Sequence, residues 1–414
     1  MNLYDPHFGR PAGTRLFCDL TQSWSDVGGG VRTYLLHKRH HILQSTPHSH
    51  LMIVPGDRDE VVEEERAVTV TIASPRVPGS PHYRLMLRNR AVRAALEQFR
   101  PDLVECQDAY NLPWGAIAYR RRRPETALVA AYMTDFPTVY VERPLSKIVT
   151  RPVASLLARI CYGYCGLLYR RFDAVFALSE NGGAGKLAAL GIPGVDVVPL
   201  GVELGEFGPQ RRDERLRAKL GLAPGQPLLV YVGRLDGEKK PDLVASAFRQ
   251  LPQSLGAKLA LIGEGPLKAD IAALGDDRII MPGYLTNRAE LARWLASSDI
   301  YVSGMADETF GISIIEAQAS GLPVVGVAAG AMIDRVTDEV GRLGPVGDSA
   351  AMAANVLAVL NGNMRAMADQ ARAHALQFSW DSSMEALFGR VYPAAFERRA
   401  EQLRPAPAAA ALAA

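Results

Sequence analysis

The segment DETFGISIIEAQASGLPVV, residues 307–325, follows the apolar run IYVSGM at 300–305. Its first five residues read as a turn. The next stretch predicts a helix over about 312–320, because Gly321 and Pro323 supply the usual C-terminal stop signals. The run LPVVGVAAG then predicts the following strand. A strand, a helix and a second strand in this order form the repeating unit of a parallel, doubly wound α/β sheet.

The same alternation extends in both directions from this segment. Short apolar runs bounded by turn residues are typical of strands covered on both faces, and longer amphipathic stretches such as YRLMLRNRAVRAALEQF, 83–99, predict helices. We therefore predict an α/β protein with two Rossmann-like, doubly wound parallel-sheet domains facing a central cleft. The strands are predicted at 14–23, 50–56, 69–74, 102–107, 127–133 and 174–179, and then at 227–235, 258–265, 279–285, 300–305 and 322–330.

A cluster of proline and glycine separates the two halves of the pattern. It contains Pro199, Gly201, Gly205, Gly208 and Pro209, and such clusters between periodic segments mark loops. The predicted organisation is an N-terminal domain at 1–200, a second domain at 201–375, a helix at 376–398 that packs back on the N-terminal domain, and a disordered tail at 399–414.

Composition supports a globular chain of two domains. The chain has 414 residues, of which 48% are hydrophobic and 22% charged, and this length exceeds what one core usually serves. The four cysteines are too few and scattered for a disulfide framework, so we expect small buried side chains. The N-terminus lacks a signal-peptide pattern and no run is long enough to span a bilayer. We expect a cytoplasmic protein, peripheral at most on the inner face of the cell membrane.

The turn and helix of the opening segment form a candidate anion site. The amides of Gly311, Ile312 and Ser313 lie at the predicted helix N-terminus, where backbone N–H groups lack partners and attract phosphate. Glu308 precedes this point and Glu316 follows it, so each carboxylate could meet the hydroxyls of a ring on one side of the phosphate. The alternative is that both are ordinary surface acids. Glu316 lies within an apolar run, where an unpaired carboxylate is costly, and this favours a partner.

Two further segments carry residues suited to a diphosphate. In YVGRLDGEKKPDL, Arg234 leaves a strand and Lys239 follows before a helix; arginine can bind phosphate with two hydrogen bonds and lysine as a point charge. Lys240 is more simply a solvated loop residue. Near the N-terminus, Gly29 and Gly30 belong to a glycine-rich turn that lets a ligand approach the backbone. That turn alone would also suit a dehydrogenase, although its spacing is not the dinucleotide-binding one.

Taken together, these segments resemble the retaining glycosyltransferases of family 4, which have the GT-B fold. Glu308 and Glu316 match the family's Glu-x7-Glu motif, and Arg234 and Lys239 match its Gly-Arg-x4-Lys motif. The glycine-rich turn matches the family's N-terminal Gly-Gly loop. The resemblance covers nearly all of the second half and is patchier in the first.

The resemblance implies a role for each matching residue. Arg234 and Lys239 would hold the donor diphosphate and act in catalysis with Glu308, which would contact the donor sugar. The turn residues Thr309 and Phe310 would belong to the donor site. The remaining donor-binding residues would be Gly29, Gly30, Gly311, Ile312 and Glu316, the last on the ribose. Such enzymes need no cofactor and no bound metal, since cationic side chains and a helix N-terminus stabilise the leaving diphosphate. We expect a hexose donor carried by UDP or GDP.

One position departs from the family pattern. Family members often have a histidine after the strand that here ends ALVAAYM, whereas this chain has Met133, which cannot donate a hydrogen bond. Thr134 or Asp135 could supply the sugar or acceptor contact instead, or the contact could be lost.

The acceptor side is indicated mainly by charge. Between Arg76 and Arg171 the sequence contains fifteen arginines and one lysine but only seven acidic residues, although the net charge of the whole chain is only +2. Basic residues among Leu, Ile, Tyr and Val are typical of a surface that lies on anionic lipid, or of half-buried helices whose arginines reach solvent. We expect a membrane lipid or lipid-linked glycan as acceptor and an anionic membrane surface as a partner. Nucleic acid is disfavoured, because the basic runs lack stacking aromatics or a known module.

Two alternatives remain at this level. One is a nucleotide-sugar epimerase of GT-B fold, which would release a sugar without an acceptor. The other is a catalytically weakened protein that binds a nucleotide sugar, with Met133 as the sign of the loss.

Overall fold

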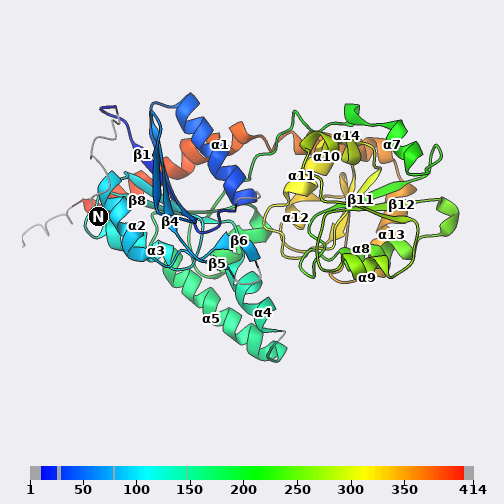
Figure 1. Ribbon diagram of the computed structural model, residues 1–414, viewed down its shortest axis with the longest axis horizontal. Helices are drawn as coiled ribbons and strands as arrows, with labels where there is room; N and C mark the ends of the chain where they lie inside the picture. Colours follow the sequence, from blue (N-terminus) through cyan, green and yellow to red (C-terminus); the bar gives the residue numbers. More distant parts are fainter. Residues whose placement is uncertain (1–10, 26–28, 78–79, 147, 405–414) are drawn as a thin grey trace, which may run out of the picture. The chain divides into compact units, whose positions relative to one another are not determined.

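The computed structural model describes residues 11–25, 29–77, 80–146 and 148–404. The chain forms two compact units. Unit 1 consists of Met1–Leu178, Gly183–Val198 and Met384–Ala414, and unit 2 of Ser179–Gly182 and Pro199–Ser383. Figure 1 traces both units along the chain. The first unit is therefore built from three separate segments of the sequence.

Unit 1 contains an eight-stranded sheet in the order β10-β9-β8-β7-β1-β2-β4-β3. All neighbouring strands pair in parallel except β3, which runs antiparallel to β4 at the sheet edge. A two-stranded hairpin of β5 and β6 is separate from this sheet. The strands are β1 (Leu16–Leu20), β2 (Ser49–Gly56), β3 (Glu60–Glu63), β4 (Ala67–Ala73), β5 (Arg76–Val77), β6 (Ser80–Arg84), β7 (Leu103–Cys106), β8 (Ala127–Tyr132), β9 (Ala174–Ala177) and β10 (Asp196–Val197).

The helices of unit 1 connect these strands as a parallel sheet requires. They are α1 (Gly30–Ser45), α2 (Asn89–Phe99), α3 (Leu112–Arg120), α4 (Arg143–Leu145), α5 (Arg151–Tyr169), α6 (Gly185–Ala189) and α16 (Tyr392–Leu403), with π-helical turns η1 (Pro137–Glu142), η2 (Glu180–Ala184) and η5 (Leu387–Val391). The first three residues of η2 belong to unit 2. The amphipathic stretch 83–99 is only partly helical, because its first residues belong to strand β6.

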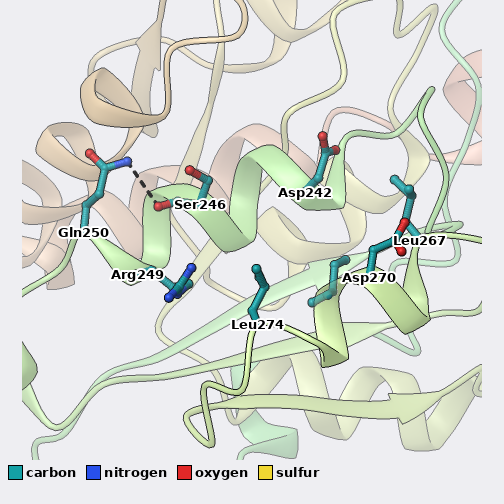
Figure 2. Close-up of a pocket in the computed structure, with 8 residues that line it drawn as sticks. Asp242, Ser246, Arg249, Gln250, Leu267, Asp270 and Leu274 are labelled. Atoms are coloured by element: carbon teal, nitrogen blue, oxygen red, sulfur yellow. Dashed lines mark hydrogen bonds between the residues drawn. The ribbon is translucent and has the colours of Figure 1, made fainter.

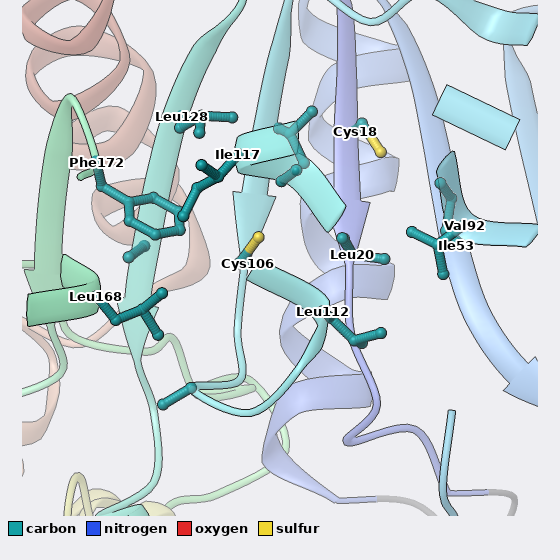
Figure 3. Close-up of a cluster of buried hydrophobic side chains, with 14 of the residues drawn as sticks. Cys18, Leu20, Ile53, Val92, Cys106, Leu112, Ile117, Leu128, Leu168 and Phe172 are labelled. Carbon is teal, nitrogen blue, oxygen red and sulfur yellow. The ribbon is translucent and has the colours of Figure 1, made fainter. Parts of the chain in front are cut away.

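The core of unit 1 lies between the sheet and these helices. Figure 3 shows Leu20 and Cys106 on the central strands, with Leu112 and Ile117 of α3 on the same side. Cys18, Cys106 and Cys165 are buried and all four cysteines are free thiols. The prediction of small buried cysteines is thus confirmed for these three, while Cys161 is half-buried.

The C-terminal helix belongs to unit 1. Phe17 of β1 stacks on Tyr392 at a centroid distance of 5.1 Å and meets Phe388 edge-on. Helix α16 continues to Leu403, so the predicted disordered tail was wrong for residues 399–403. The Arg399 side chain bonds the Pro124 carbonyl there, which gives this end of the helix a tertiary contact. Residues 405–414 of the predicted tail lie outside the described part.

Tyr392 also joins a buried ionic network beneath the sheet. The Lys38 ammonium lies 2.5 Å from Asp19 Oδ1 and 2.9 Å from Glu105 Oε1, and all three side chains are almost wholly buried. Lys38 donates to the Tyr392 hydroxyl at 3.0 Å, and that hydroxyl donates to Glu105 Oε2 at 2.7 Å. His50 Nε2 lies 2.7 Å from Asp19 Oδ2. Buried charges of this kind need their partners, so the network ties the last helix to strands β1, β2 and β7.

Unit 2 contains a six-stranded, entirely parallel sheet in the order β13-β12-β11-β14-β15-β16. The central strand β11 (LLVYV) is apolar and almost fully buried, as expected for a strand covered on both faces. The strands are β11 (Leu228–Val232), β12 (Lys258–Ile262), β13 (Ile279–Gly283), β14 (Ile300–Val302), β15 (Val324–Val327) and β16 (Gly341–Gly344).

Side-chain caps begin several helices of unit 2. The carboxylate or amide oxygens of Asp213, Asn287, Asp348 and Asn363 accept from backbone N–H groups of the first turn. The helices are α7 (Glu214–Lys219), α8 (Pro241–Arg249), α9 (Lys268–Ala272), α10 (Arg288–Ala296), α11 (Ile312–Ala319), α12 (Met332–Arg335), α13 (Ser349–Leu360), α14 (Met364–Ala375) and α15 (Trp380–Ala386), with 3₁₀ turns η3 (Pro209–Arg211) and η4 (Gln253–Leu255). The last three residues of α15 belong to unit 1.

The prediction of an α/β chain with two doubly wound sheets is confirmed. The sequence pattern missed β3, β10, β16 and the β5–β6 hairpin. Strand β16 (GRLG) has a single large apolar residue, and β3 (EVVE) is a short acidic edge strand, so neither shows the apolar run used for prediction. Among the described residues, no helix combines the length and apolarity needed to cross a bilayer.

Candidate functional site

The predicted donor residues of unit 2 lie where the strand order of its sheet reverses. From β11 the chain proceeds outward through β12 and β13, and β14 then returns to the other side of β11. The carboxyl ends of β11 and β14 are therefore neighbours at a topological switch point, which is where open α/β sheets bind ligands. The loop after β11 carries Arg234 and Lys239, and the loop after β14 carries Glu308 and Gly311.

The loop after β11 is held by its own polar groups. Asp236 Oδ1 accepts from the backbone N–H groups of Glu238 and Lys239 at 3.1 and 3.0 Å. The buried Tyr231 hydroxyl donates to the Arg234 carbonyl at 2.8 Å. Next to it, Gly263 is required, because a Cβ there would lie 1.9 Å from the Gly233 carbonyl oxygen. The backbone of this loop is therefore fixed on both sides.

Arg234 and Lys239 differ in their present partners. The Arg234 guanidinium pairs with Asp236 at 2.5 Å and Glu238 at 2.9 Å, and its side chain is 63% exposed. The Lys239 ammonium lies 3.1 Å from Glu308 Oε2. The structure thus brings Lys239 and Glu308 together, while Arg234 is paired within its own loop.

Glu308 already occupies an anion-binding position. Its Oε1 accepts from the Gly311 backbone N–H at 3.1 Å, while its Oε2 pairs with Lys239. Burial alone would raise the pKa of this carboxyl, but the Lys239 charge and the amides of Phe310 and Gly311 outweigh it and lower the pKa. The group is therefore a carboxylate at neutral pH, held by one cation and a helix N-terminus.

The start of α11 has the geometry predicted for a phosphate site. Gly311 precedes the helix with φ of 88°, a conformation that favours glycine. Ile312 is the first helical residue, so its N–H is among those without a partner inside the helix. The Ser313 hydroxyl lies 2.8 Å from that of Tyr301 on β14, and the Tyr301 hydroxyl donates to the Val232 carbonyl at 3.3 Å. Tyr301 thus links the helix start to the end of β11.

Neighbouring loops hold the turn between β14 and α11. Ser179 Oγ donates to the Thr309 carbonyl at 2.9 Å. The buried Arg335 donates from Nε to the Phe310 carbonyl at 3.2 Å, and its guanidinium lies over the Phe310 and Phe378 rings. Its burial lowers the Arg335 pKa to about 10, so it remains a cation at neutral pH. The turn is therefore fixed by a buried positive charge that the sequence pattern did not indicate.

Glu316 has the partner that its apolar surroundings demand. The residue is 3% exposed, and its Oε1 lies 2.6 Å from Arg288 Nη2 at the start of α10. Burial raises the pKa of Glu316, and the Arg288 charge opposes this. Arg288 also lies over the Phe207 ring at 4.8 Å. Sequence reasoning missed Arg288, because 28 residues separate it from Glu316 and only the fold makes them neighbours.

The remaining predicted site residues lie in unit 1. Gly29, with φ of 132°, and Gly30 stand at the start of α1, after strand β1. Met133 is buried and Thr134 is half-buried at the end of β8. Asp135 is fully buried; its carboxylate pairs with Lys186 at 2.6 Å and accepts from the Tyr162 hydroxyl at 2.7 Å. Asp135 therefore has partners within the protein.

The Asp334 carboxylate on α12 binds Asn181. Its two oxygens accept from the Asn181 backbone and side-chain N–H groups at 2.9 and 2.8 Å. It fastens the short segment Ser179–Gly182 to unit 2.

A shallow pocket of about 400 Å³ lies elsewhere in unit 2, between α8 and α9. Figure 2 shows Asp242 and Arg249 on α8, and Leu274 beyond the end of α9. None of the predicted donor residues lines it. Within the described ranges, no group of three or more His, Cys, Asp or Glu side chains is arranged to hold a metal ion.

Comparison with protein families gives two matches that together cover most of the chain. Residues 28–206 match the model described as Glycosyltransferase Family 4, and residues 212–375 match the model described as Glycosyl transferases group 1. The second match contains all the predicted donor residues of unit 2.

Several individual glycosyltransferases are also similar to this chain in sequence. A GDP-mannose-dependent alpha-mannosyltransferase of Mycobacterium tuberculosis is 31% identical over 87% of this chain and 92% of its own length. A GDP-mannose-dependent alpha-(1-6)-phosphatidylinositol dimannoside mannosyltransferase of the same species is 29% identical over 71% of this chain and 74% of its own length. Sulfoquinovosyl transferase SQD2 of Arabidopsis thaliana is 30% identical over 70% of this chain, but that match spans only 57% of its length.

The solved structures agree on the fold. Sucrose-phosphate synthase from Thermosynechococcus elongatus superposes with a TM-score of 0.69 and 20% identity, covering 92% of this chain and all of that one. At this identity the likeness concerns the fold, which is the GT-B arrangement of two Rossmann-like domains.

Proposed function

Since this chain belongs to glycosyltransferase family 4 and is a hexosyltransferase, we propose that it moves a hexose with retention from a UDP- or GDP-sugar to a membrane lipid or lipid-linked glycan. The donor part of this proposal is supported by the contact of Lys239 with Glu308 at the N-terminal end of α11. One cation, one carboxylate and a helix N-terminus meet there at the switch point of the sheet.

The donor diphosphate would displace the protein's own carboxylate from this position. Glu308 accepts from the Gly311 amide and the Lys239 ammonium, which are the groups a phosphate would use. When the phosphate binds, the carboxylate turns to the sugar hydroxyls. Arg234 is exposed enough to exchange its partners Asp236 and Glu238 for the second phosphate.

The proposed chemistry is a transfer on one face of the sugar. The bond between the anomeric carbon and the phosphate oxygen breaks, and its electron pair stays on the diphosphate. The acceptor oxygen bonds to the same face of that carbon, and its proton passes to the departing phosphate. Lys239, Arg234 and the α11 amides stabilise the developing negative charge without a bound metal.

Glu316 would accept from the ribose hydroxyls. It is buried beside Arg288, which keeps a charge partner next to it. The Gly29–Gly30 turn would approach the donor through its backbone. Met133, Thr134 and Asp135 would lie on the acceptor side, with Asp135 kept in place by Lys186.

The acceptor proposal is supported by a relative and by charge. One similar protein is named for action on a phosphatidylinositol dimannoside. The basic excess between Arg76 and Arg171 suits an anionic surface. We propose that the protein works as a peripheral enzyme at the cytoplasmic face of the membrane.

Replacing the lysine tests the donor site. We expect Lys239→Ala to lower kcat for nucleotide release from the donor by about 10²-fold or more, because a charge aimed at the leaving group is lost. Lys219→Ala, an exposed lysine of the same unit, is the matched control. UDP-hexose and GDP-hexose are assayed separately, after a thermal-shift screen has shown which diphosphate stabilises the protein. Equal rates for both variants would contradict the proposal.

A further inference from the structure

Helix α5 presents two different apolar faces. One packs inside unit 1 and includes the buried Ala154, Ala158, Cys165 and Leu168. The other is open to solvent, where large side chains are normally scarce. Its members, with their exposed fractions, are Val153 (45%), Leu156 (58%), Leu157 (38%), Ile160 (61%) and Leu167 (64%).

These exposed side chains form one stripe. They are three, one, three and seven residues apart, so at 3.6 residues per turn they project from the same side of the helix. The buried residues lie on the other side. The stripe covers 15 residues, from Val153 to Leu167, and the 14 steps between them make it roughly 21 Å long at 1.5 Å per residue. One apolar stripe that faces the core is ordinary for a helix. A second apolar stripe of this length on the solvent side indicates that another apolar surface covers it.

The segment before the helix extends the same property. Ile148 is 81% exposed and Val149 37%, and both immediately precede α5. Figure 1 shows that the N-terminal end of α5, near α4, reaches beyond the strands of its own unit. We call this surface, from Ile148 to Leu167, the α5 face.

Charge identifies the occupant of the α5 face. The sequence from Arg143 to Phe172 contains six basic residues and no acidic one. Arg159 and Arg170 are exposed and project beside the stripe, and Arg151 is exposed at the start of the helix. Apolar side chains flanked by arginines suit the boundary between acyl chains and anionic headgroups. A second protein surface would instead need acidic complements to these arginines.

We propose that the α5 face docks the protein onto an anionic lipid bilayer, with the helix lying in the plane of the membrane. The stripe enters the acyl boundary and the arginines contact headgroup phosphates. Because the opposite face packs on unit 1, the helix lies on the bilayer and does not cross it. The docking stands on its own residues; only its purpose, delivery of a lipid acceptor, rests on the proposed function.

Vesicle flotation tests the proposal with the full chain. We expect the wild type to float with phosphatidylcholine vesicles containing phosphatidylglycerol, and to bind pure phosphatidylcholine at least tenfold more weakly. Leu156→Asp/Ile160→Asp should reduce binding to the anionic vesicles by about 10²-fold, since two anchoring side chains become charged. Leu87→Asp/Val62→Asp, which adds the same charges at two exposed positions of unit 1, should bind like the wild type.

A second pair of substitutions separates the charge contribution. Arg151→Ala and Arg159→Ala should each weaken binding about fivefold, and added salt should weaken the wild type in the same direction. Failure of the wild type to bind, or equal binding by Leu156→Asp/Ile160→Asp, would overturn the proposal. So would a dimer of the wild type that this variant disrupts, because the occupant would then be a second copy.

Measurement of nucleotide release from the donor distinguishes the membrane-docking proposal from the proposed function. None of the residues assigned to the donor lies on α5, so Leu156→Asp/Ile160→Asp should retain nucleotide release in solution. A variant that releases nucleotide normally but no longer floats supports the docking. A wild type that floats but has no donor activity would contradict the proposed function and leave the docking intact.

Discussion

At the scale of single residues, the proposed donor site contains one carboxylate with two roles. Glu308 pairs with Lys239 and accepts from the Gly311 amide. It is also the group expected to meet the donor sugar. Glu308 and a donor phosphate would compete for the same amide and the same cation, so the carboxylate should lower the affinity for the phosphate.

This competition leads to a prediction for Glu308→Gln. We expect the affinity for the free nucleotide diphosphate to rise several-fold, since a neutral amide competes less well for the cation. Sugar transfer should fall by about 10²-fold or more, because the charged contact with the sugar is lost. Isothermal titration with the diphosphate and steady-state kinetics measure the two effects. A parallel loss of both would show that Glu308 only maintains the loop.

The motif residues were predictable from the sequence because the chain keeps them at fixed spacings. Glu308, Gly311 and Glu316 lie within one loop and one helix, so their relation follows from local geometry. Arg288 and Arg335 were not predictable, since each reaches the site from a different helix, α10 and α12. No spacing links them to the residues that they hold.

At the scale of the structural element, α11 is bounded by two glycines in the same left-handed conformation. Gly311 has φ of 88° and Gly321 of 81°. A Cβ at Gly311 would lie 2.5 Å from Ile314 Cδ1, whereas at Gly321 the nearest atom would be 3.6 Å away. The two ends of one helix therefore offer a matched pair of substitutions.

We expect Gly311→Ala and Gly321→Ala each to lower the free energy of unfolding by about 1 kcal/mol through the strained backbone, with a further loss at Gly311 from the contact with Ile314. Only Gly311→Ala should also lower donor affinity, by tenfold or more, because it lies at the phosphate-binding end. Urea unfolding and nucleotide titration separate the effects. Equal nucleotide affinities of the two variants would mean that the N-terminus of α11 does not bind the donor.

Among the strands, those with continuous apolar runs were predicted and those without were missed. Strand β11 reads as five apolar residues, whereas β16 (GRLG) is recognisable only by its parallel pairing with β15. Likewise the apolar residues of α5 predict an amphipathic helix, but not which face is packed. That distinction depends on burial, which only the folded unit determines.

At the scale of the whole molecule, the buried network of Lys38 makes the stability of unit 1 depend on pH. Burial lowers the pKa of His50 to about 4, against the hydrogen bond to Asp19 that raises it. The folded state therefore favours the neutral ring. This contribution is fully present above about pH 6.5, the unfolded pKa, and is lost as the pH falls through that value towards 4.

We expect the free energy of unfolding to decrease by up to about 3 kcal/mol between pH 6.5 and 4 because of His50, at 1.4 kcal/mol per pKa unit. Urea unfolding followed by a probe in unit 1 measures this. In His50→Gln the decrease should be smaller by that amount, because no proton is taken up at this position on unfolding. An unchanged pH dependence in that variant would mean that the ring is not the titrating group.

The placement of the last helix has a consequence for how the protein is made. Unit 1 takes its first strands from the start of the chain and α16, with Tyr392, from the end. During synthesis the ribosome releases the whole of unit 2 before it releases this helix. The first unit to begin is thus the last to be finished, and until then Lys38 and Glu105 lack their tyrosine and Phe17 lacks its stacking ring. The surface of β1 that α16 covers must therefore be protected from aggregation until the ribosome has released this helix.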